Sequence, residues 1–160
     1  MNKIIGVIGG RRVKKDLLDA AEEVGRLIAE SGEMMICGGL GGVMEAAAKG
    51  AKEAGGVTIG ILPRERRESA NPYINIPIAT GLGIGRNIII ARTADALIAV
   101  GGEYGTLSEI AFGLQLGKTV VGINSWNIKG MIEADNAEDV NDCCNAHTYV
   151  RSVSCSCGES

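Results

Sequence analysis

The chain has 160 residues, a length typical of a single domain, so separate lobes for a cofactor and a substrate are not expected. Hydrophobic residues make up 46% of the chain and charged residues 22%, which excludes a disordered or fibrous protein. The net charge of -3 and the aromatic content of 3% do not provide the basic surface and stacking rings of nucleic-acid binding proteins, so a nucleic-acid partner is not expected.

The location of the protein is inferred from its apolar segments and its cysteines. No apolar stretch reaches the roughly 18 residues that span a bilayer, and residues 1–3 run into a predicted strand without a cleavage-site pattern. Four of the five cysteines fall in residues 143–160, which is not the arrangement of a secreted disulfide framework. We therefore expect a cytoplasmic protein that does not bind membranes.

Predicted strands and helices alternate along the chain. The first strand is expected at Ile4–Ile8, and a helix follows because apolar residues recur at helical spacing from Val13 to Ile28, until Gly32 ends it. Further strands are predicted at Met34–Cys37, Val57–Leu62, Ile76–Ala79, Asp95–Val100 and Thr119–Ile123, and further helices at Val43–Ala54, Asn87–Thr93 and Thr106–Leu116. Continuously apolar strands that alternate with helices predict an α/β protein with a doubly wound, Rossmann-like, mostly parallel sheet and helices on both faces.

This single domain is expected to cover residues 1–140. Residues 141–160 are polar and rich in Ser and Cys, and we expect them to form a disordered or atypical tail. The tail holds five metal ligands by residue type, namely Cys143, Cys144, His147, Cys155 and Cys157. Their spacing matches neither of the usual paired Cys-x-x-Cys zinc patterns, so no metal site is expected.

Three of the predicted strands end in a glycine pair: Gly9-Gly10, Gly38-Gly39 and Gly101-Gly102. The second and third pairs continue as Gly-Gly-x-x-Gly into a helix, which adds Gly42 and Gly105. The carboxyl ends of parallel strands lie along one edge of an open sheet, where ligands bind near the point at which the strand order reverses. One such pair is explained by a tight turn alone, whereas three on one edge favour a common binding site.

A glycine turn that opens a helix presents unpaired N–H groups and the positive end of the helix dipole, an arrangement that suits a phosphate. The candidate phosphate- or nucleotide-binding residues are Gly9, Gly10, Gly38, Gly39, Gly42, Gly101, Gly102, Gly105 and Thr106. No bound cofactor such as NAD is expected, because Gly-x-Gly-x-x-Gly is missing after the first strand. Gly117–Thr119 is not a phosphate loop, because it lies between a helix and a strand rather than between a strand and a helix.

Two charged side chains are candidate catalytic residues at this edge. Glu109 lies one helical turn after Thr106, where it either reaches the ligand or forms a capping box with Thr106. Arg86 follows the glycine-rich residues 80–85 and is either a solvated helix residue or a group that binds a phosphate or a ribose hydroxyl. The glycine-rich context of Arg86 favours the binding role.

The segment Gly101–Glu109 resembles the PGGxGTxxE signature of the Lonely Guy (LOG) family, long mislabelled as lysine decarboxylases. Gly38–Glu45 resembles the other glycine motif of that family. Within the family, the chain is most similar to small bacterial proteins that resemble the algal molybdenum-cofactor carrier, with Gly85–Asn87 and Arg92–Asp95 in matching places. The resemblance covers residues 3–124 and implies the same α/β fold.

In the enzymes of the LOG family, the resemblance implies hydrolysis of the N-glycosidic bond of a nucleoside 5′-monophosphate. Glu109 would then orient or activate water and stabilise an oxocarbenium-like transition state, and Arg86 would bind the substrate. Two positions depart from the enzymes: Val100 replaces the leading Pro of the signature, and Asn87 stands where a basic residue is usual. A lysine decarboxylase is not expected, because nothing marks a Schiff-base lysine with a pyridoxal pocket.

Two functions stay open for a homo-oligomer that binds a nucleotide or another phosphorylated small molecule. One is a nucleotide phosphoribohydrolase, and the other is a carrier for a phosphate-bearing cofactor such as molybdopterin, which would not need Glu109. A DNA-handling relative is disfavoured by the acidic composition. Arg64, Arg66 and Arg67 alternate with acidic residues in the loop 63–75, a pattern typical of a solvated loop, and a role in closing over a ligand stays open.

Overall fold

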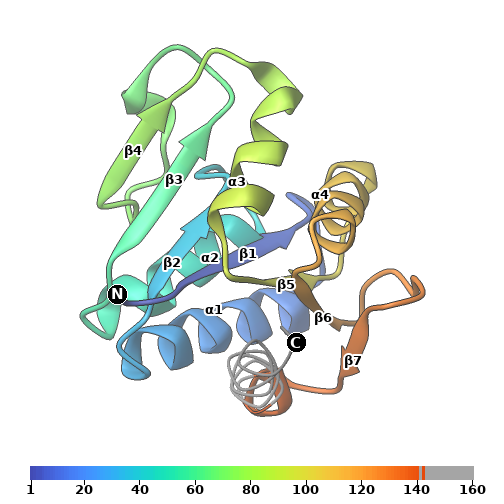
Figure 1. The fold of residues 1–160 in the computed structure, drawn as a ribbon. Coiled ribbons are helices and arrows are strands. Elements are labelled where there is room, and N and C mark those ends of the chain that lie inside the picture. The colour runs from blue at the N-terminus through green and yellow to red at the C-terminus, as the bar shows by residue number, and fades with distance from the viewer. Residues whose placement is uncertain (141, 143–160) are drawn as a thin grey trace, which may run out of the picture.

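A parallel sheet forms the centre of the protein in the computed structural model, which describes residues 1–140 and 142. Its strands are β1 Ile4–Gly9, β2 Met34–Cys37, β3 Thr58–Leu62, β4 Ile76–Ala79, β5 Ala96–Val100, β6 Thr119–Ile123 and β7 Ile132–Ala134. They lie in the order β4-β3-β2-β1-β5-β6-β7, and every neighbouring pair is parallel (Figure 1). The strand order therefore reverses between β1 and β5.

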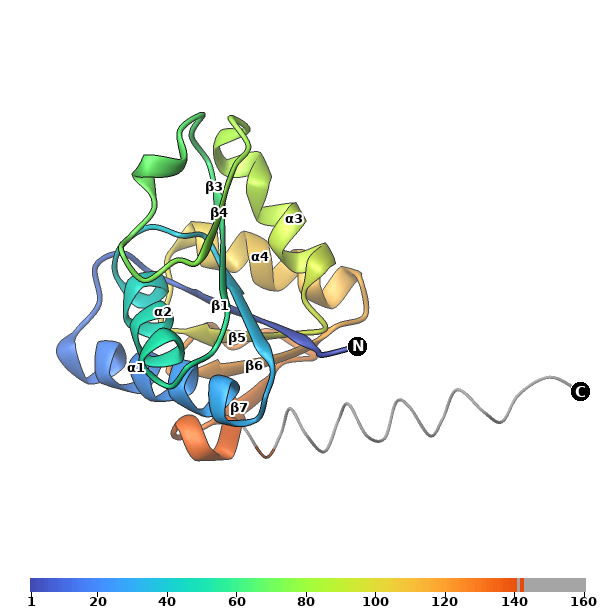
Figure 2. The same ribbon diagram turned by 90° about the vertical axis from the view of Figure 1, so that its left-hand side faces the viewer.

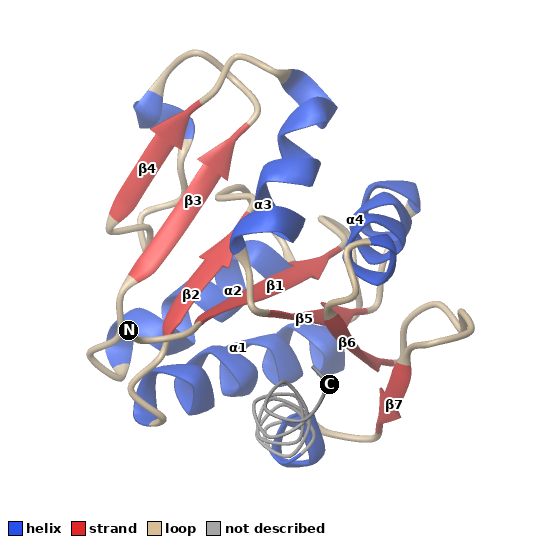
Figure 3. Cartoon of the chain, in the orientation of Figure 1, coloured by secondary structure: helices blue, strands red, loops and turns tan. Residues whose placement is uncertain are grey.

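Helices cover both faces of this sheet, as Figures 2 and 3 show. On one face α1 (Lys15–Glu30) packs beside α2 (Val43–Glu53), and on the other α3 (Asn87–Thr93) packs beside α4 (Tyr104–Gln115). Two short 3-10 turns, η1 (Arg67–Ser69) and η2 (Gly83–Arg86), complete the connections on either side of β4. The arrangement confirms the predicted doubly wound, Rossmann-like fold.

The continuous apolar character of the strands follows from this double cover. Val7 of β1 packs with α1 and α2, whereas its neighbour Ile8 packs with α3 and α4. In β5, Ile98 and Ala99 divide between the two cores in the same way. Since successive side chains of a strand point to opposite faces, a strand that is covered on both sides needs apolar residues at every position.

Helices α1 and α2 are in contact through glycines that the sequence analysis did not single out. A Cβ atom at Gly25 would lie 1.9 Å from the carbonyl oxygen of Ala47, and a Cβ atom at Gly50 would lie 1.9 Å from that of Glu22. Only a residue without a side chain allows the two backbones to approach this closely. The two helices thereby pack in close backbone contact on one face of the sheet.

The bounds of the predicted strands and helices agree with the structure to within two residues, and two differences bear on the site or the sheet. Helix α4 begins at Tyr104, two residues before the predicted start at Thr106. Strand β7 was not predicted, because it has only three residues and is recognisable as a strand only through its pairing with β6. Ala137 and Val140, which follow β7, are buried in the core beside α1 and α2.

The expectation of a disordered tail at residues 141–160 falls outside the described residues, apart from Asp142. The five potential metal ligands at 143–157 also lie outside them. Among residues 1–140 and 142, no three His, Cys, Asp or Glu side chains lie together as a metal site would require. None of the helices in this described part is both long enough and apolar enough to cross a membrane.

Candidate functional site

A cleft of about 320 Å³ lies at the carboxyl ends of the central strands, where the strand order reverses. Its floor and walls come from the turn after β1, from Gly38 after β2, from η2 and from the first turns of α4. Ligand sites of open α/β sheets lie at this position, because the loops on the two sides of the reversal diverge and leave a crevice.

The cleft brings together seven of the eleven site residues that the sequence predicted. Those that line it are Gly9, Gly10, Gly38, Arg86, Gly105, Thr106 and Glu109. The four that do not line it are Gly39, Gly42, Gly101 and Gly102. Residues that are more than 60 positions apart in the chain, such as Gly38 and Gly105, thus face one cavity.

Gly42 illustrates what a glycine outside the cleft does. Its φ is +68°, and a Cβ atom there would lie 2.4 Å from the carbonyl oxygen of Gly10. The same carbonyl accepts a hydrogen bond of 3.1 Å from the N–H of Val43, the first residue of α2. Gly42 therefore holds the start of α2 against the turn after β1, and its predicted contact with a ligand stays a prediction.

Arg86 lines the cleft and lies against the backbone of Gly38. A Cβ atom at Gly38 would be only 1.9 Å from Nη1 of Arg86, so the guanidinium occupies the space that any other side chain at position 38 would fill. Arg86 is 8% exposed, and its Nε and Nη1 atoms are buried without a hydrogen-bond partner. An unpartnered buried guanidinium is destabilising, and an anionic ligand would satisfy it.

Glu109 contributes the second charged group of the cleft. It is 7% exposed, and its burial raises the pKa of the carboxyl to about 8, although the positive charge of Arg86 acts in the opposite direction. Burial likewise lowers the pKa of Arg86, and the charge of Glu109 opposes that shift. The charges of Arg86 and Glu109 thus affect each other's pKa. The two side chains are not among the ion-paired residues of the described part of the chain.

The alternative role of Glu109 as a helix cap is wrong. Because α4 begins at Tyr104, its N-cap residue is Glu103, and no side chain caps the helix. Thr106 and Glu109 thus lie inside the helix, and a capping box needs its Ser or Thr at the N-cap position. The carboxyl of Glu109 is available to the cleft instead.

The first turn of α4 presents an open surface to the cleft. No heavy atom lies within 4 Å of the position that a Cβ atom of Gly105 would take. The turn is fixed from α3, because the side chain of Asn87 donates to Oγ of Ser108 at 3.2 Å, and this hydroxyl donates to the carbonyl oxygen of Gly105 at 2.6 Å. Asn87, where the LOG enzymes usually carry a basic residue, thus has a positioning role.

Several lining residues were missed by the sequence analysis, namely Arg11, Met44, Pro63, Ile84, Asn87 and Glu103. Arg11 could have been found, because it directly follows the first glycine pair. Ile84 carries no such signal, yet it lines the mouth of the cleft and is 89% exposed, which is unusual for an apolar side chain. The structure agrees that Gly117–Thr119 is not a phosphate loop, because Gly117 follows α4 and Thr119 begins β6.

The model of the SLOG cluster4 family matches residues 2–152 of the chain. The chain belongs to the SLOG cluster4 family. An uncharacterized protein of Archaeoglobus fulgidus is 48% identical over 141 residues, which cover 88% of this chain and 93% of that protein. The cytokinin riboside 5′-monophosphate phosphoribohydrolase LOG of Oryza sativa subsp. japonica is 33% identical over 101 residues, which cover 61% of this chain and 41% of that protein.

Solved structures of similar proteins have the same fold as this SLOG cluster4 member. The molybdenum cofactor binding protein of Rippkaea orientalis superposes with a TM-score of 0.88 at 34% identity, covering 92% of this chain and 98% of that one. The molybdenum cofactor carrier protein of Chlamydomonas reinhardtii superposes with a TM-score of 0.85 at 33% identity, covering 93% and 99%. The matches confirm the resemblance to the LOG family and to its molybdenum-cofactor-carrier-like members.

The raised pKa of Glu109 predicts a pH-dependent stability. The folded protein holds a proton on Glu109 up to a pH of about 8, whereas the unfolded chain releases it near the ordinary value of 4.5. The stability from this proton is therefore complete below pH 4.5 and is lost as the pH rises to about 8. Over this range, the free energy of unfolding of the wild type should fall relative to that of Glu109→Gln, by at most about 1.4 kcal/mol per pH unit.

Denaturant unfolding of both proteins at a series of pH values measures this difference, and all other titrating groups cancel in it. A constant difference would contradict the burial of a titrating carboxyl at position 109.

Proposed function

We propose that the chain binds a phosphate-bearing small molecule of the nucleotide class in the cleft where the strand order reverses. The observation that carries this proposal is the guanidinium of Arg86, which is buried in the cleft wall with Nε and Nη1 unpartnered. A buried cation is stable only when an anion or hydrogen-bond acceptor satisfies it. A phosphate accepts the paired N–H groups of a guanidinium in the required geometry.

The first turn of α4 offers a second set of phosphate ligands. The N–H of Leu107 donates to the carbonyl oxygen of Glu103, so the N–H groups of the three residues between them precede the first hydrogen bond of the helix. Gly105, one of these three, faces open space in the cleft. Unpaired N–H groups and the helix dipole together favour an anion at this position.

The similar proteins support the same class of ligand. The two similar structures are described as binding or carrying the molybdenum cofactor, and the rice relative as acting on a riboside 5′-monophosphate. A phosphate-bearing cofactor and a nucleotide share the group that Arg86 and α4 are suited to bind. Binding is therefore the function that both similarities have in common, whether or not turnover follows.

The substitution Arg86→Met tests whether the buried guanidinium of Arg86 binds the ligand. The substitution keeps a long side chain beside Gly38 but removes the buried charge, so AMP binding should weaken at least tenfold, with tenfold corresponding to about 1.4 kcal/mol. The free energy of unfolding should stay the same or rise by about 1 kcal/mol, because the variant no longer buries an unpaired cation. Calorimetric titration with AMP and denaturant unfolding measure the two effects.

Arg92→Met is the matched control for Arg86→Met. It removes the same charge from the exposed last turn of α3, away from the cleft, and should leave AMP affinity unchanged. Unweakened AMP binding in Arg86→Met would overturn the proposed function. A loss of affinity in both variants would show a general charge effect and would also count against a specific site.

Gly105→Val tests the contribution of α4. The new side chain would fill the open space beside the first turn of the helix, so AMP binding should be abolished while the fold is kept. Tyr104→Val introduces the same β-branched residue one position earlier, at a side chain that does not line the cleft, and should retain binding. Calorimetry showing equal AMP affinity in Gly105→Val and the wild type would place the phosphate elsewhere. Gly102→Val is unsuitable, because a Cβ atom there would lie 2.7 Å from that of Thr106.

Hydrolysis of the N-glycosidic bond of a bound nucleoside 5′-monophosphate is the second candidate function. It is favoured by the carboxyl of Glu109, which lines the same cleft as Arg86 and has no capping role. In this reaction water adds to the anomeric carbon, the bond to the base breaks, and the base leaves with a proton. A carboxylate would stabilise the positive charge that develops on the sugar ring.

Glu109→Gln separates catalysis from binding. If Glu109 acts as a carboxylate, the variant should bind AMP but release free base at least a hundredfold more slowly, because only the charge is lost. Release by the wild type should also increase as the pH rises through about 8, where the carboxyl ionises in the free protein. Chromatography of a panel of nucleoside monophosphates measures the released base. Equal release by both proteins would exclude the catalytic role, and binding without any release would favour the carrier.

A further inference from the structure

We propose that the ligand of the cleft carries a second phosphate group, which is held by Arg11 and Arg64 in an adjoining hollow. This proposal rests on the proposed function and extends it from a monophosphate to a ligand with a diphosphate. The hollow, called the side hollow below, has a volume of about 300 Å³ and is lined by Arg11, Gly41, Glu45, Arg64 and Asn71, among others.

The side hollow adjoins the cleft at Arg11. This residue follows Gly9-Gly10 at the end of β1 and lines both cavities. Arg64 follows β3 on the other side of the side hollow, beside Pro63, which lines the cleft. Arg11 therefore belongs to the walls of both cavities, and Arg64 belongs to the wall of the side hollow.

The wall of the side hollow is fixed by hydrogen bonds. The N–H of Asn71 donates to the carbonyl oxygen of Gly39 at 2.9 Å, and its side-chain amide donates to that of Leu40 at 2.8 Å. The side-chain oxygen of Asn71 in turn accepts a bond of 3.0 Å from the N–H of Tyr73. The loop after η1 is thus attached to the turn after β2, so the side hollow is a built feature rather than a gap beside a loose loop.

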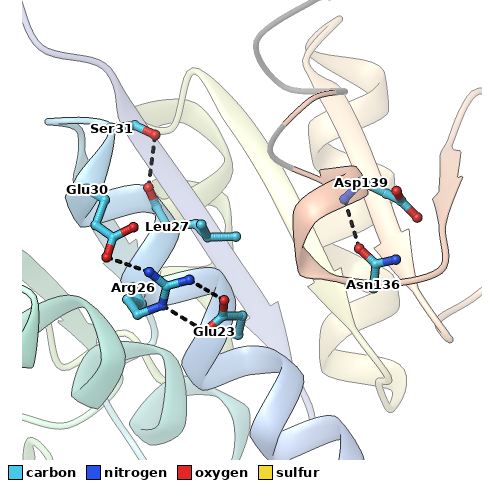
Figure 4. A network of polar contacts seen from close by, with 7 residues as sticks. All are labelled: Glu23, Arg26, Leu27, Glu30, Ser31, Asn136 and Asp139. Carbon is cyan, nitrogen blue, oxygen red and sulfur yellow. Dashed lines mark hydrogen bonds and ion pairs between the residues drawn. The ribbon is translucent and has the colours of Figure 1, made fainter.

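The side chains of Arg11 and Arg64 form no hydrogen bond or ion pair within the described part of the chain. All four ion pairs of this part lie on α1 or between α1 and α2, where for example Arg26 binds Glu23 and Glu30 (Figure 4). Glu45 lines the side hollow but pairs with neither Arg11 nor Arg64. Three arginines thus follow one another along the cleft and the side hollow without a bound carboxylate.

Arg11 and Arg86 repel each other in the free protein. The charge of Arg11 contributes to the lowered pKa of Arg86, after the larger effect of burial. A phosphate at Arg86 and a second phosphate between Arg11 and Arg64 would each offset the positive charge of these side chains. The arginines of the loop 63–75 are not equivalent, since Arg64 lines the side hollow whereas Arg67 lines neither the cleft nor the side hollow.

The test compares AMP, ADP and a dinucleotide of two adenosines joined by a diphosphate, each titrated calorimetrically at one ionic strength. ADP and the dinucleotide should bind the wild type about tenfold more tightly than AMP, as expected for added charge-assisted hydrogen bonds. Arg64→Gln should remove this gain and leave AMP affinity unchanged. A gain for ADP alone would identify a terminal phosphate as the second group, and an equal gain for the dinucleotide would identify a bridging one.

Arg67→Gln is the matched control, because it makes the same change of charge in the same loop and should keep the gain. Equal affinities of the wild type for AMP and the two diphosphates would overturn the second phosphate site while leaving the proposed function intact. Equal losses in Arg64→Gln and Arg67→Gln would also overturn it, because they would reflect the general field of the loop. If none of the three ligands binds, the proposed function itself fails.

Discussion

The guanidinium of Arg86 lies directly against the backbone of Gly38, and the character of the site depends on this contact. A side chain at position 38 would take the place of the guanidinium, so the glycine after β2 allows the cation to lie in the wall of the cleft. The protein leaves two of its nitrogen atoms unpartnered there. A buried cation whose nitrogen atoms lack a hydrogen-bond partner is destabilising to the fold, and the proposed anionic ligand would remove this cost.

The charge state of Glu109 is coupled to the nearby charge of Arg86. This charge state distinguishes the two functions that stay open, the carrier and the phosphoribohydrolase. The burial of Glu109 favours the neutral carboxyl, and the nearby cation favours the carboxylate. A binding protein can use the neutral form as a hydrogen-bond donor, whereas a phosphoribohydrolase needs the charge. The same pair of side chains therefore suits a carrier and an enzyme, which agrees with similarity to molybdenum cofactor binding proteins over nearly the whole chain and to a LOG enzyme over 61% of it.

The closely packed helices α1 and α2 lie apart from the edge of the sheet where the cleft is found. The interhelical approach at Gly25 and Gly50 and the ion pairs of Arg26 lie on α1 and α2, on one face of the sheet. The arginines that line the cleft and the side hollow lie in loops at the carboxyl ends of the strands and are unpaired. Charged groups on α1 and α2 form ion pairs with one another, whereas the arginines at the carboxyl ends of the strands remain available for an anion.

The sequence alone determined the strand and helix alternation, the doubly wound sheet and seven residues of the cleft, because continuous apolar strands and glycine-ended turns are local patterns with a direct physical cause. It could not decide whether Glu109 caps α4, since that depends on where the helix begins, and the helix begins at Tyr104. Nor could it separate Gly38, which faces Arg86, from Gly42, which packs on Gly10. Only the tertiary structure decides these roles, because they depend on which distant backbone or side-chain atoms occupy the space beside each residue.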